Sequence, residues 1–444
     1  HYCFARSTDS RHEIFEEQEP EPSGTISIYT ATKTIYASAK TVMETHTTQL
    51  VLLIGICILA SVILRNLLRR IKLPGLIGFI VFGFLIRFVD TQLPILGKDG
   101  MEVFAVLGKL GIICLLFKVG LESNLAGLRK QLGRAGLIWT GNIVISGGAG
   151  FALARYALSL DLLPSLFVGV AMTATSIGVS VRVWDEAGKL QTPSGQLLLD
   201  VAELDDLSGV VFMAFLFGLA PLLLEHGHSE ELVSVGLKTG GIIALKLIAF
   251  GGACYAFARY GERKLTSFSA RLRPKPDPML FLLAVGMLAA ALAGWLGFSV
   301  AIGAFFAGLV FSGDPKAVKM ERSFGALHEL FVPFFFIHLG LLVPVSHLAT
   351  GLQIGLLLFL VAAGGKFFGG FIPGRFLADT KRSALLGLSL LPRAEITMVV
   401  MSYGRTLGER VIPTKVFVGM IWVVLLTCIA GTVSTGFLIN KIKS

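Results

Sequence analysis

A succession of long apolar segments decides what kind of fold this sequence can adopt. From Thr48 onward, 13 segments are long enough to cross the hydrocarbon core of a bilayer, which takes about 20 residues of helix. Their approximate bounds are 48–68, 74–90, 102–120, 136–158, 163–184, 196–224, 232–259, 278–293, 297–312, 324–346, 351–377, 383–405 and 413–439. Charged residues make up only 15% of the chain, against about 25% in soluble domains. We therefore predict an all-α polytopic membrane protein with about 13 transmembrane helices, and a water-soluble globule is excluded.

The residues before the first apolar segment differ in character. Residues 1–47 are polar, lack hydrophobic periodicity and lack the basic-then-apolar pattern of a signal peptide. We expect a polar extramembranous tail there, followed by one membrane domain over residues 48–444.

The basic residues indicate how the chain is oriented. The net charge is +10, which in a soluble protein would suggest a nucleic-acid partner. Most lysines and arginines instead fall in one set of alternate loops, including the clusters within 65–72, 129–134 and 259–275, whereas the opposite loops hold few. The positive-inside rule then places the C-terminus in the cytoplasm and the N-terminal tail outside. This alternation leaves no support for a nucleic-acid partner.

Six ionisable residues lie well inside predicted spans, where an unpaired charge costs about 2.5 to 3.5 kcal/mol near the bilayer centre. They are Glu203, Asp205, Asp206, Lys366, Arg393 and Glu395. Structural ion pairs are the alternative explanation, but replacing such a pair by apolar groups is often neutral or stabilising. We therefore interpret the six residues as functional.

The adjacent acids Asp205 and Asp206 suggest a specific chemistry. Neighbouring side chains on a helix point about 100° apart, so the two carboxylates can serve different partners. Glu203 lies three residues before Asp206, on nearly the same face. Two close carboxylates in a low dielectric do not easily both ionise unless a cation compensates. That cation can be Lys366, a bound metal ion or a proton, and interchange among the three is the chemistry of cation/proton exchange.

Two predicted spans also carry residues that interrupt helices. The fifth contains Thr173, Thr175 and Ser176 before Gly178. The twelfth contains Pro392, followed by the charged residues Arg393 and Glu395. The fifth span is next to the sixth, which holds Asp205 and Asp206, and the twelfth is next to the eleventh, which holds Lys366. Read as repeats, spans two to six correspond to spans nine to thirteen. We predict inverted repeats with two broken helices that cross at the ion site, as in secondary transporters. Ordinary proline kinks are the alternative.

Eight stretches resemble the monovalent cation:proton antiporter-2 family, which includes bacterial sodium/proton exchangers and glutathione-gated potassium/proton exchangers. The stretches, in order along the chain, are IKLPGLIGFIVFGFLI, LGIICLLFKVGLE, ATSIGVSVRVWDEAG, LDDLSGVV, AIGAFFAGLVFS, LFVPFFFIHLGL, GGKFFGG and LLPRAEI. The likeness covers residues from about Leu50 to Ile439.

The resemblance assigns roles to residues of the motifs. It implies that Asp206 carries the cation and the proton, that Asp205 pairs with Lys366, and that both aspartates hold the sodium ion. It places helix breaks and supporting side chains at Thr175, Ser176, Arg393 and Glu395. The Asp-Asp pair resembles the sodium or lithium exchangers, whose exchange is typically electrogenic, whereas potassium exchangers commonly carry Gln-Asp. The sequence departs from the family pattern at Glu203, a candidate modulator of the site, and at Lys118.

The resemblance also implies an architecture and a setting. We expect a secondary active sodium(or lithium)/proton antiporter in a bacterial inner membrane, a homodimer in the lipid bilayer that works by alternating access. The transport bundle would comprise residues 136–224 and 351–439, and the dimerisation scaffold residues 48–120 and 232–346. A potassium/proton antiporter and a cation channel are the alternatives. The sequence contains no Walker loop, GxGxxG or GxSxG motif, so an ATP-driven pump or an enzyme has no support and no cofactor is expected.

Overall fold

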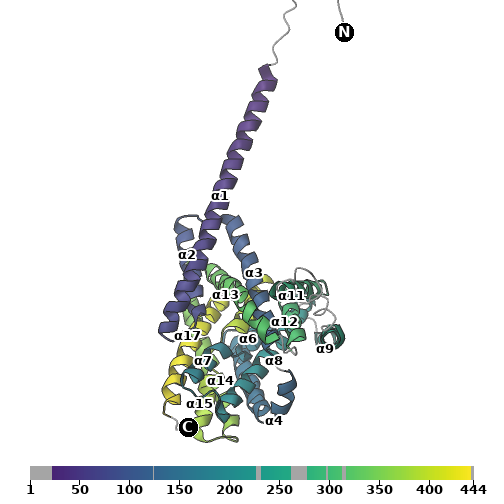
Figure 1. The fold of residues 1–444 in the computed structure, drawn as a ribbon, viewed down its shortest axis with the longest axis vertical. Helices are drawn as coiled ribbons and strands as arrows, with labels where there is room; N and C mark the ends of the chain where they lie inside the picture. The colour runs from purple at the N-terminus through teal and green to yellow at the C-terminus, as the bar shows by residue number, and fades with distance from the viewer. Residues whose placement is uncertain are drawn as a thin grey trace, which may run out of the picture. The chain divides into compact units, whose positions relative to one another are not determined.

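The computed structural model describes residues 23–123, 125–226, 232–261, 278–296, 299–312 and 317–441. Within these ranges the chain is helical and contains no strand, as Figure 1 shows. The chain divides into two compact units, His1–Gly55 and Ile56–Ser444.

The helices of the described residues have the following bounds. They are α1 (Ser23–Arg70), α2 (Gly75–Gln92), α3 (Gly97–Glu122), α4 (Leu125–Asn142), η1 (Ile143–Gly147), α5 (Gly148–Ala152), η2 (Leu153–Ala157), α6 (Leu162–Thr173), α7 (Ile177–Glu186), α8 (Pro193–His226), α9 (Leu232–Ala256), η3 (Phe257–Gly261), α11 (Pro278–Trp295), α12 (Val300–Phe311), α13 (Ala317–Leu341), η4 (Val345–His347), α14 (Leu348–Gly374), α15 (Thr380–Ser389), α16 (Glu395–Thr406) and α17 (Thr414–Ile439). Helices η1, η2 and η3 are π-helical and η4 is a 3-10 turn.

The prediction of an all-α membrane protein is confirmed. Nine helical segments of the described residues are long and apolar enough to cross a membrane, and two shorter apolar helices lie within α11 and α12. Every predicted span contains a helix, but the count of 13 is not confirmed, because some of these helices are too short. A break divides the twelfth predicted span into α15 and α16, which have 10 and 12 residues.

The first unit contains the segment predicted to be an extramembranous tail. Its described residues, 23–55, belong to α1. The polar segment is therefore helical from Ser23 onward, while residues 1–22 lie outside the described part. The stretch 23–47 contains no proline, so no residue of that kind stops a helix that continues into the apolar residues. Polarity alone does not end a helix.

In the second unit, two rows of helices repeat the same order. The first row is α2, α3, α4 with its π-helical continuation, the broken pair α6 and α7, and α8; the second is α12, α13, α14, the broken pair α15 and α16, and α17. Contacts between the rows are reciprocal, because α2 packs on α13 as α12 packs on α3, and α8 packs on α16 as α17 packs on α7. Inverted repeats related by a two-fold axis predict this reciprocity. The predicted repeats with two broken helices are confirmed.

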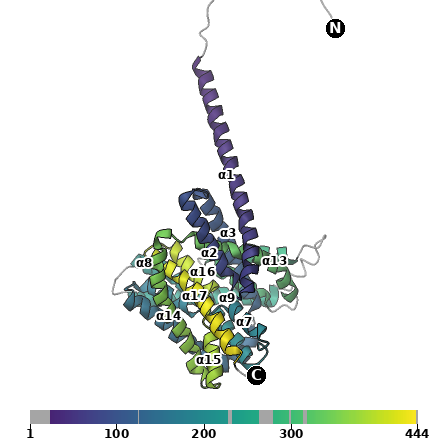
Figure 2. The same cartoon turned by 90° about the vertical axis from the view of Figure 1, so that its left-hand side faces the viewer.

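Packing within the second unit gathers the helices into two groups. The scaffold group, defined as α2, α3, α11, α12 and α13, packs together, and the bundle group consists of α4, α6, α7, α8, α14, α15, α16 and α17. Figure 2 shows α14, α15 and α17 side by side. A buried apolar cluster around Trp184 includes Ile138, Leu204 and Leu390, and so joins α4, α7 and α8 to the end of α15. This cluster fixes Leu204, next to Asp205, against the second helix break.

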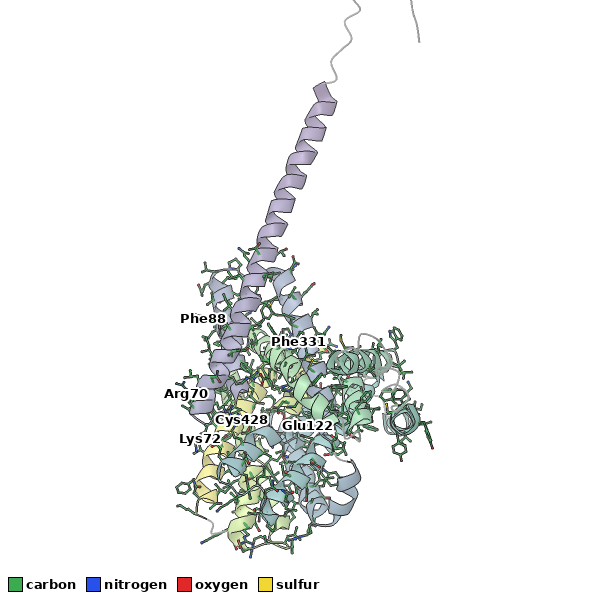
Figure 3. All side chains as sticks on the ribbon, viewed as in Figure 1. Arg70, Lys72, Phe88, Glu122, Phe331 and Cys428 are labelled. Carbon is green, nitrogen blue, oxygen red and sulfur yellow. The ribbon has the colours of Figure 1, made fainter. Side chains whose placement is uncertain are left out.

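Glycines bring α3 and α12 of the scaffold group into close contact. A Cβ atom on Gly120 would overlap the carbonyl oxygen of Phe305, and one on Gly308 would overlap that of Phe117. Small residues of this kind allow membrane helices to approach until their backbones touch. The ends of α3 and α12 are therefore held firmly together, and Glu122, labelled in Figure 3, lies at this end of α3.

Candidate functional site

The two broken helices meet at their breaks. Helix α6 ends at Thr173 and α7 begins at Ile177, with Ala174 and Ser176 in extended conformations between them. The backbone N–H of Ser176 donates to the carbonyl oxygen of Pro392 in the second break, at 2.8 Å. Each break thus satisfies a backbone group of the other, which a lipid environment demands of non-helical backbone.

Two buried cations cover the C-terminal end of α6. Arg393 donates to the carbonyl oxygens of Met172 and Ala174, and its other terminal nitrogen donates to Ala362 O and Ser146 Oγ, both at 2.9 Å. Lys366 donates to the carbonyl oxygen of Thr173. A helix C-terminus carries a partial negative charge, so the two cations stabilise an end that would otherwise face the membrane interior unpaired.

One carboxylate oxygen of Asp205 lies at the centre of a buried hydrogen-bonded cluster. Its side chain and that of Lys366 are both 0% exposed, and Lys366 Nζ lies 2.9 Å from Asp205 Oδ2. The same oxygen accepts hydrogen bonds from Thr175 Oγ1 at 2.6 Å and from Asn142 Nδ2 at 2.5 Å. Thr175 Oγ1 also accepts from Lys366 Nζ at 2.6 Å. The second carboxylate oxygen of Asp205, Oδ1, is buried and has no hydrogen-bond partner among the described residues.

Asp206 has a different environment from its neighbour. It forms no hydrogen bond or ion pair with other described residues, and it borders a cavity of about 430 Å³. The cavity is lined by Leu115, Lys118, Val119, Glu122, Ser123, Thr175, Gly178, Leu199, Glu203, Asp206, His328, Glu395 and Ile396. An unpartnered carboxylate at the wall of a cavity is free to bind a small cation or a proton. Thr175 is the contact between this cavity and the Asp205 cluster.

Glu395 occupies the first position of α16, directly after the second break. Its carboxylate accepts a hydrogen bond from Ser176 Oγ at 2.9 Å. The N-terminus of a helix carries a partial positive charge that favours a carboxylate. Glu395 thereby ties the two breaks together while its side chain borders the same cavity as Asp206.

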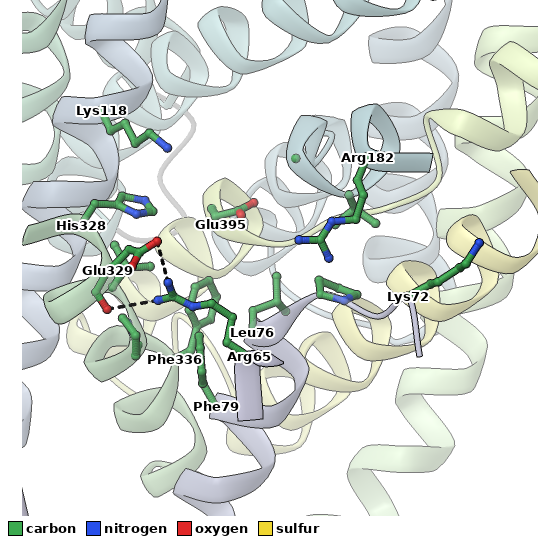
Figure 4. Close-up of a pocket in the computed structure, with 16 residues that line it drawn as sticks. Arg65, Lys72, Leu76, Phe79, Lys118, Arg182, His328, Glu329, Phe336 and Glu395 are labelled. Atoms are coloured by element: carbon green, nitrogen blue, oxygen red, sulfur yellow. Dashed lines mark hydrogen bonds and ion pairs between the residues drawn. The ribbon is translucent and has the colours of Figure 1, made fainter. Parts of the chain in front are cut away.

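A second cavity, of about 310 Å³, shares four lining residues with the first, namely Lys118, Gly178, His328 and Glu395. Figure 4 shows Lys118 and His328 on one side of it, Arg182 on the other, and Glu395 between them. Arg65 forms an ion pair with Glu329 at 2.7 Å, and Lys72 forms one with Glu186 at 3.4 Å. The shared residues make the two cavities adjacent, so together they extend from the loop after α1 to Asp206.

The structure brings all the residues singled out from the sequence to the two helix breaks and the cavity beside them. Two polar residues that contribute to the site, Asn142 and Ser146, had not been predicted. A signal existed, because these residues are four apart on a mostly apolar predicted span and so share one helix face. Gly365 and Gly369 of α14 face the backbone of these residues closely, which holds Lys366 beside them.

The amino-acid sequence was compared with models of protein families and with known proteins. A model described as "Sodium/hydrogen exchanger, transmembrane" matches residues 56–441. The chain is 29% identical over 317 residues to the high-affinity Na+/H+ antiporter NhaS3 of Synechocystis, covering 69% of this chain and 66% of that protein. It is 25% identical over 390 residues to a Na+/H+ antiporter of Enterococcus hirae, covering 87% of this chain and 97% of that protein.

The fold has a solved counterpart. The sodium proton antiporter MjNhaP1 from Methanocaldococcus jannaschii superposes with a TM-score of 0.66 at 17% sequence identity, covering 89% of this chain and 99% of the other. That likeness shows a common fold. The relatives are transporters, and so is this chain, which is not an enzyme. Because the family model spans nearly the whole of the second unit, the chain belongs to the family of transmembrane sodium/hydrogen exchangers.

Proposed function

We propose that this chain exchanges sodium or lithium ions for protons by alternating access, and that Asp206 is the carboxylate that the two ions share. One observation carries the proposal. Of two adjacent aspartates, Asp205 is fully buried against Lys366, whereas Asp206 borders a cavity without a partner among the described residues.

Competition at one carboxylate provides the coupling. A carboxylate in a low-dielectric site is costly when ionised and alone, so Asp206 is stable when it holds either a cation or a proton. The loaded forms can then change sides, and the empty charged form does so rarely. Cation movement in one direction is thereby tied to proton movement in the other.

The choice of sodium or lithium rests on the paired aspartates and on relatives that are named Na+/H+ antiporters. Lys366 and Asp205 form a buried ion pair beside Asp206. We propose that this pair opens and closes during the transport cycle and makes the exchange electrogenic. The sodium ion would draw ligands from Asp206 and Asp205, with Thr175 between them.

The two helix groups suggest which parts move. We propose that residues 136–224 and 351–439 form the transport bundle, and that residues 48–120 and 232–346 form a scaffold that also joins two copies as a homodimer. Both breaks and Asp206 lie in the bundle group, while α3 and α13 of the scaffold group border the cavities. We propose a bacterial inner membrane, with the N-terminus outside and the C-terminus in the cytoplasm. The cavities would then open toward the cytoplasm, because Arg65 and Lys72 of the basic cluster within 65–72 line the second cavity and basic clusters mark cytoplasmic loops.

Proteoliposomes test the proposal directly. The protein is reconstituted with a pH-sensitive dye inside, and sodium, lithium or potassium is added outside in turn. Sodium and lithium are expected to drive protons outward, and the response should grow when an imposed membrane potential favours net charge movement. Proton release with potassium alone would indicate potassium/proton exchange, and cation flux that drives no protons would indicate a channel.

Glu203 is expected to tune the site without carrying ions. It borders the same cavity as Asp206, and a nearby negative charge favours the protonated form of a carboxyl group. Glu203→Ala and Glu203→Gln should therefore both shift the pH profile of exchange to lower pH and leave the maximal rate within about twofold, whereas Glu203→Asp should keep the profile. Loss of transport in a folded Glu203→Gln protein would instead make the third acid essential.

A further inference from the structure

The cavity beside Asp206 has a charge composition that creates a selectivity problem. Four carboxylates line it, from Glu122, Glu203, Asp206 and Glu395, and one ammonium group, from Lys118. Carboxylate oxygens are the ligands that calcium and magnesium ions prefer. A cavity with this composition is expected to attract divalent cations more strongly than sodium unless something opposes them.

Lys118 is placed to oppose them. It lies on α3, and its Nζ is 3.3 Å from Glu122 Oε1. It lines both cavities, with His328 and Glu395, and Figure 4 shows its side chain directed toward the space between these two residues. A cation that moves from the second cavity, near Arg65 and Lys72, to Asp206 therefore passes Lys118. The side chain is 30% exposed, so it is neither buried as a core contact nor free in solvent.

We propose that Lys118 is a specificity-determining residue whose fixed positive charge excludes divalent cations from the site at Asp206. The inference rests on the proposed function, since it takes Asp206 as the cation site. It accounts for a lysine in a predicted span, because its charge discriminates by valence. The structural alternative is that Lys118 only forms a surface ion pair with Glu122, four residues on, which would stabilise α3 by a small amount.

The two explanations differ in a ratio that can be measured. Coulomb energy is proportional to the charge of the approaching ion. Removing one positive charge therefore strengthens the binding of a divalent ion twice as much, in free energy, as that of sodium. If the sodium KM falls by about threefold, the inhibition constant for magnesium or calcium should fall by about tenfold. A role in helix stability alone predicts no such ratio.

The experiment compares Lys118→Met with Lys109→Met in reconstituted protein. Lys109 lies on the same helix, is exposed, and lines neither of these two cavities. Sodium-driven proton flux is measured with increasing MgCl2 or CaCl2. Lys118→Met should become sensitive to both salts at concentrations about tenfold lower than wild type, and Lys109→Met should match wild type. Lys118→Arg should retain the wild-type resistance, and Lys118→Gln serves as a second neutral variant if the methionine variant does not fold.

A binding readout separates this inference from the proposed function. The thermal stability of the detergent-solubilised proteins is measured with and without MgCl2 or CaCl2. Stabilisation by divalent ions in Lys118→Met, absent in wild type and in Lys109→Met, supports the inference even if no sodium-driven flux is found, which would overturn the proposed function alone. Equal divalent sensitivity in all proteins, or equal changes for sodium and magnesium in Lys118→Met, would overturn the role of Lys118.

Discussion

Asp206→Asn is expected to abolish sodium-driven proton flux while the protein still inserts and folds. Asparagine keeps the shape of the side chain but neither ionises nor takes up a proton, so neither substrate can be bound in competition with the other. The fold should tolerate the change, because Asp206 makes no hydrogen bond or ion pair with the described residues around it and only borders a cavity. The measurement is the flux in proteoliposomes, which should fall to that of empty vesicles.

Two control variants test whether the loss of flux is specific to the ionisable group of Asp206. Asp200→Asn removes a carboxylate from the same helix, six residues earlier and away from both described cavities, and should exchange ions like wild type. Asp206→Glu keeps a titratable carboxylate and should retain measurable exchange with altered affinity. Sodium-driven flux near the wild-type rate in Asp206→Asn would remove Asp206 as the carrier and direct attention to Glu203 and Glu395 in the same cavity.

The different surroundings of the two aspartates could be predicted from the sequence because helix geometry leaves little freedom. Adjacent residues of an α-helix point about 100° apart, so Asp205 and Asp206 can face different surroundings. In the structure Asp205 faces Lys366 and Thr175, and Asp206 faces the cavity. The second helix break was predictable for a similar reason, since Pro392 cannot donate a backbone hydrogen bond.

Other parts of the site depend on packing between helices and could not be read from one segment. Asn142 donates to Asp205 across a sequence separation that no local pattern encodes. The same holds for Ser146, which accepts from Arg393, and for Glu122, which joins the cavity from α3. A polar helix face marks Asn142 and Ser146 in the sequence, but their partners lie on other helices, so these contacts are defined only when the helices pack together.

Lys366→Ala is expected to lower thermal stability strongly and to make the remaining exchange less electrogenic. Asp205 and Lys366 are both completely buried and 2.9 Å apart, and removing one member of such a pair leaves the other charge without a partner, at a cost of about 3 to 5 kcal/mol. Lys366 also covers the carbonyl oxygen of Thr173 at the end of α6, so its loss exposes a second unsatisfied group. Asp205→Asn should be destabilising for the reciprocal reason.

The double variant Asp205→Asn with Lys366→Ala separates pairing from these local losses. With both charges gone, no buried ion is left alone, and much of the stability should return, because replacing a whole buried pair is often nearly neutral. A double-mutant cycle on melting temperature measures this coupling directly. The carbonyl oxygen of Thr173 stays uncovered in both Lys366 variants, so its contribution cancels in the cycle.

Transport under an imposed membrane potential completes this test, because stability alone does not reveal what the pair does during exchange. If Lys366 contributes charge to the cycle, the voltage dependence of sodium-driven proton flux should weaken in Lys366→Ala and in the double variant to the same extent. Coupled melting shifts with an unchanged voltage response would leave the pair as a structural element of the two helix breaks. Additive melting shifts together with an unchanged voltage response would mean that neither the partnership nor its role in electrogenic exchange holds, since a buried contact at 2.9 Å that carries no coupling energy cannot transmit the arrival of a cation.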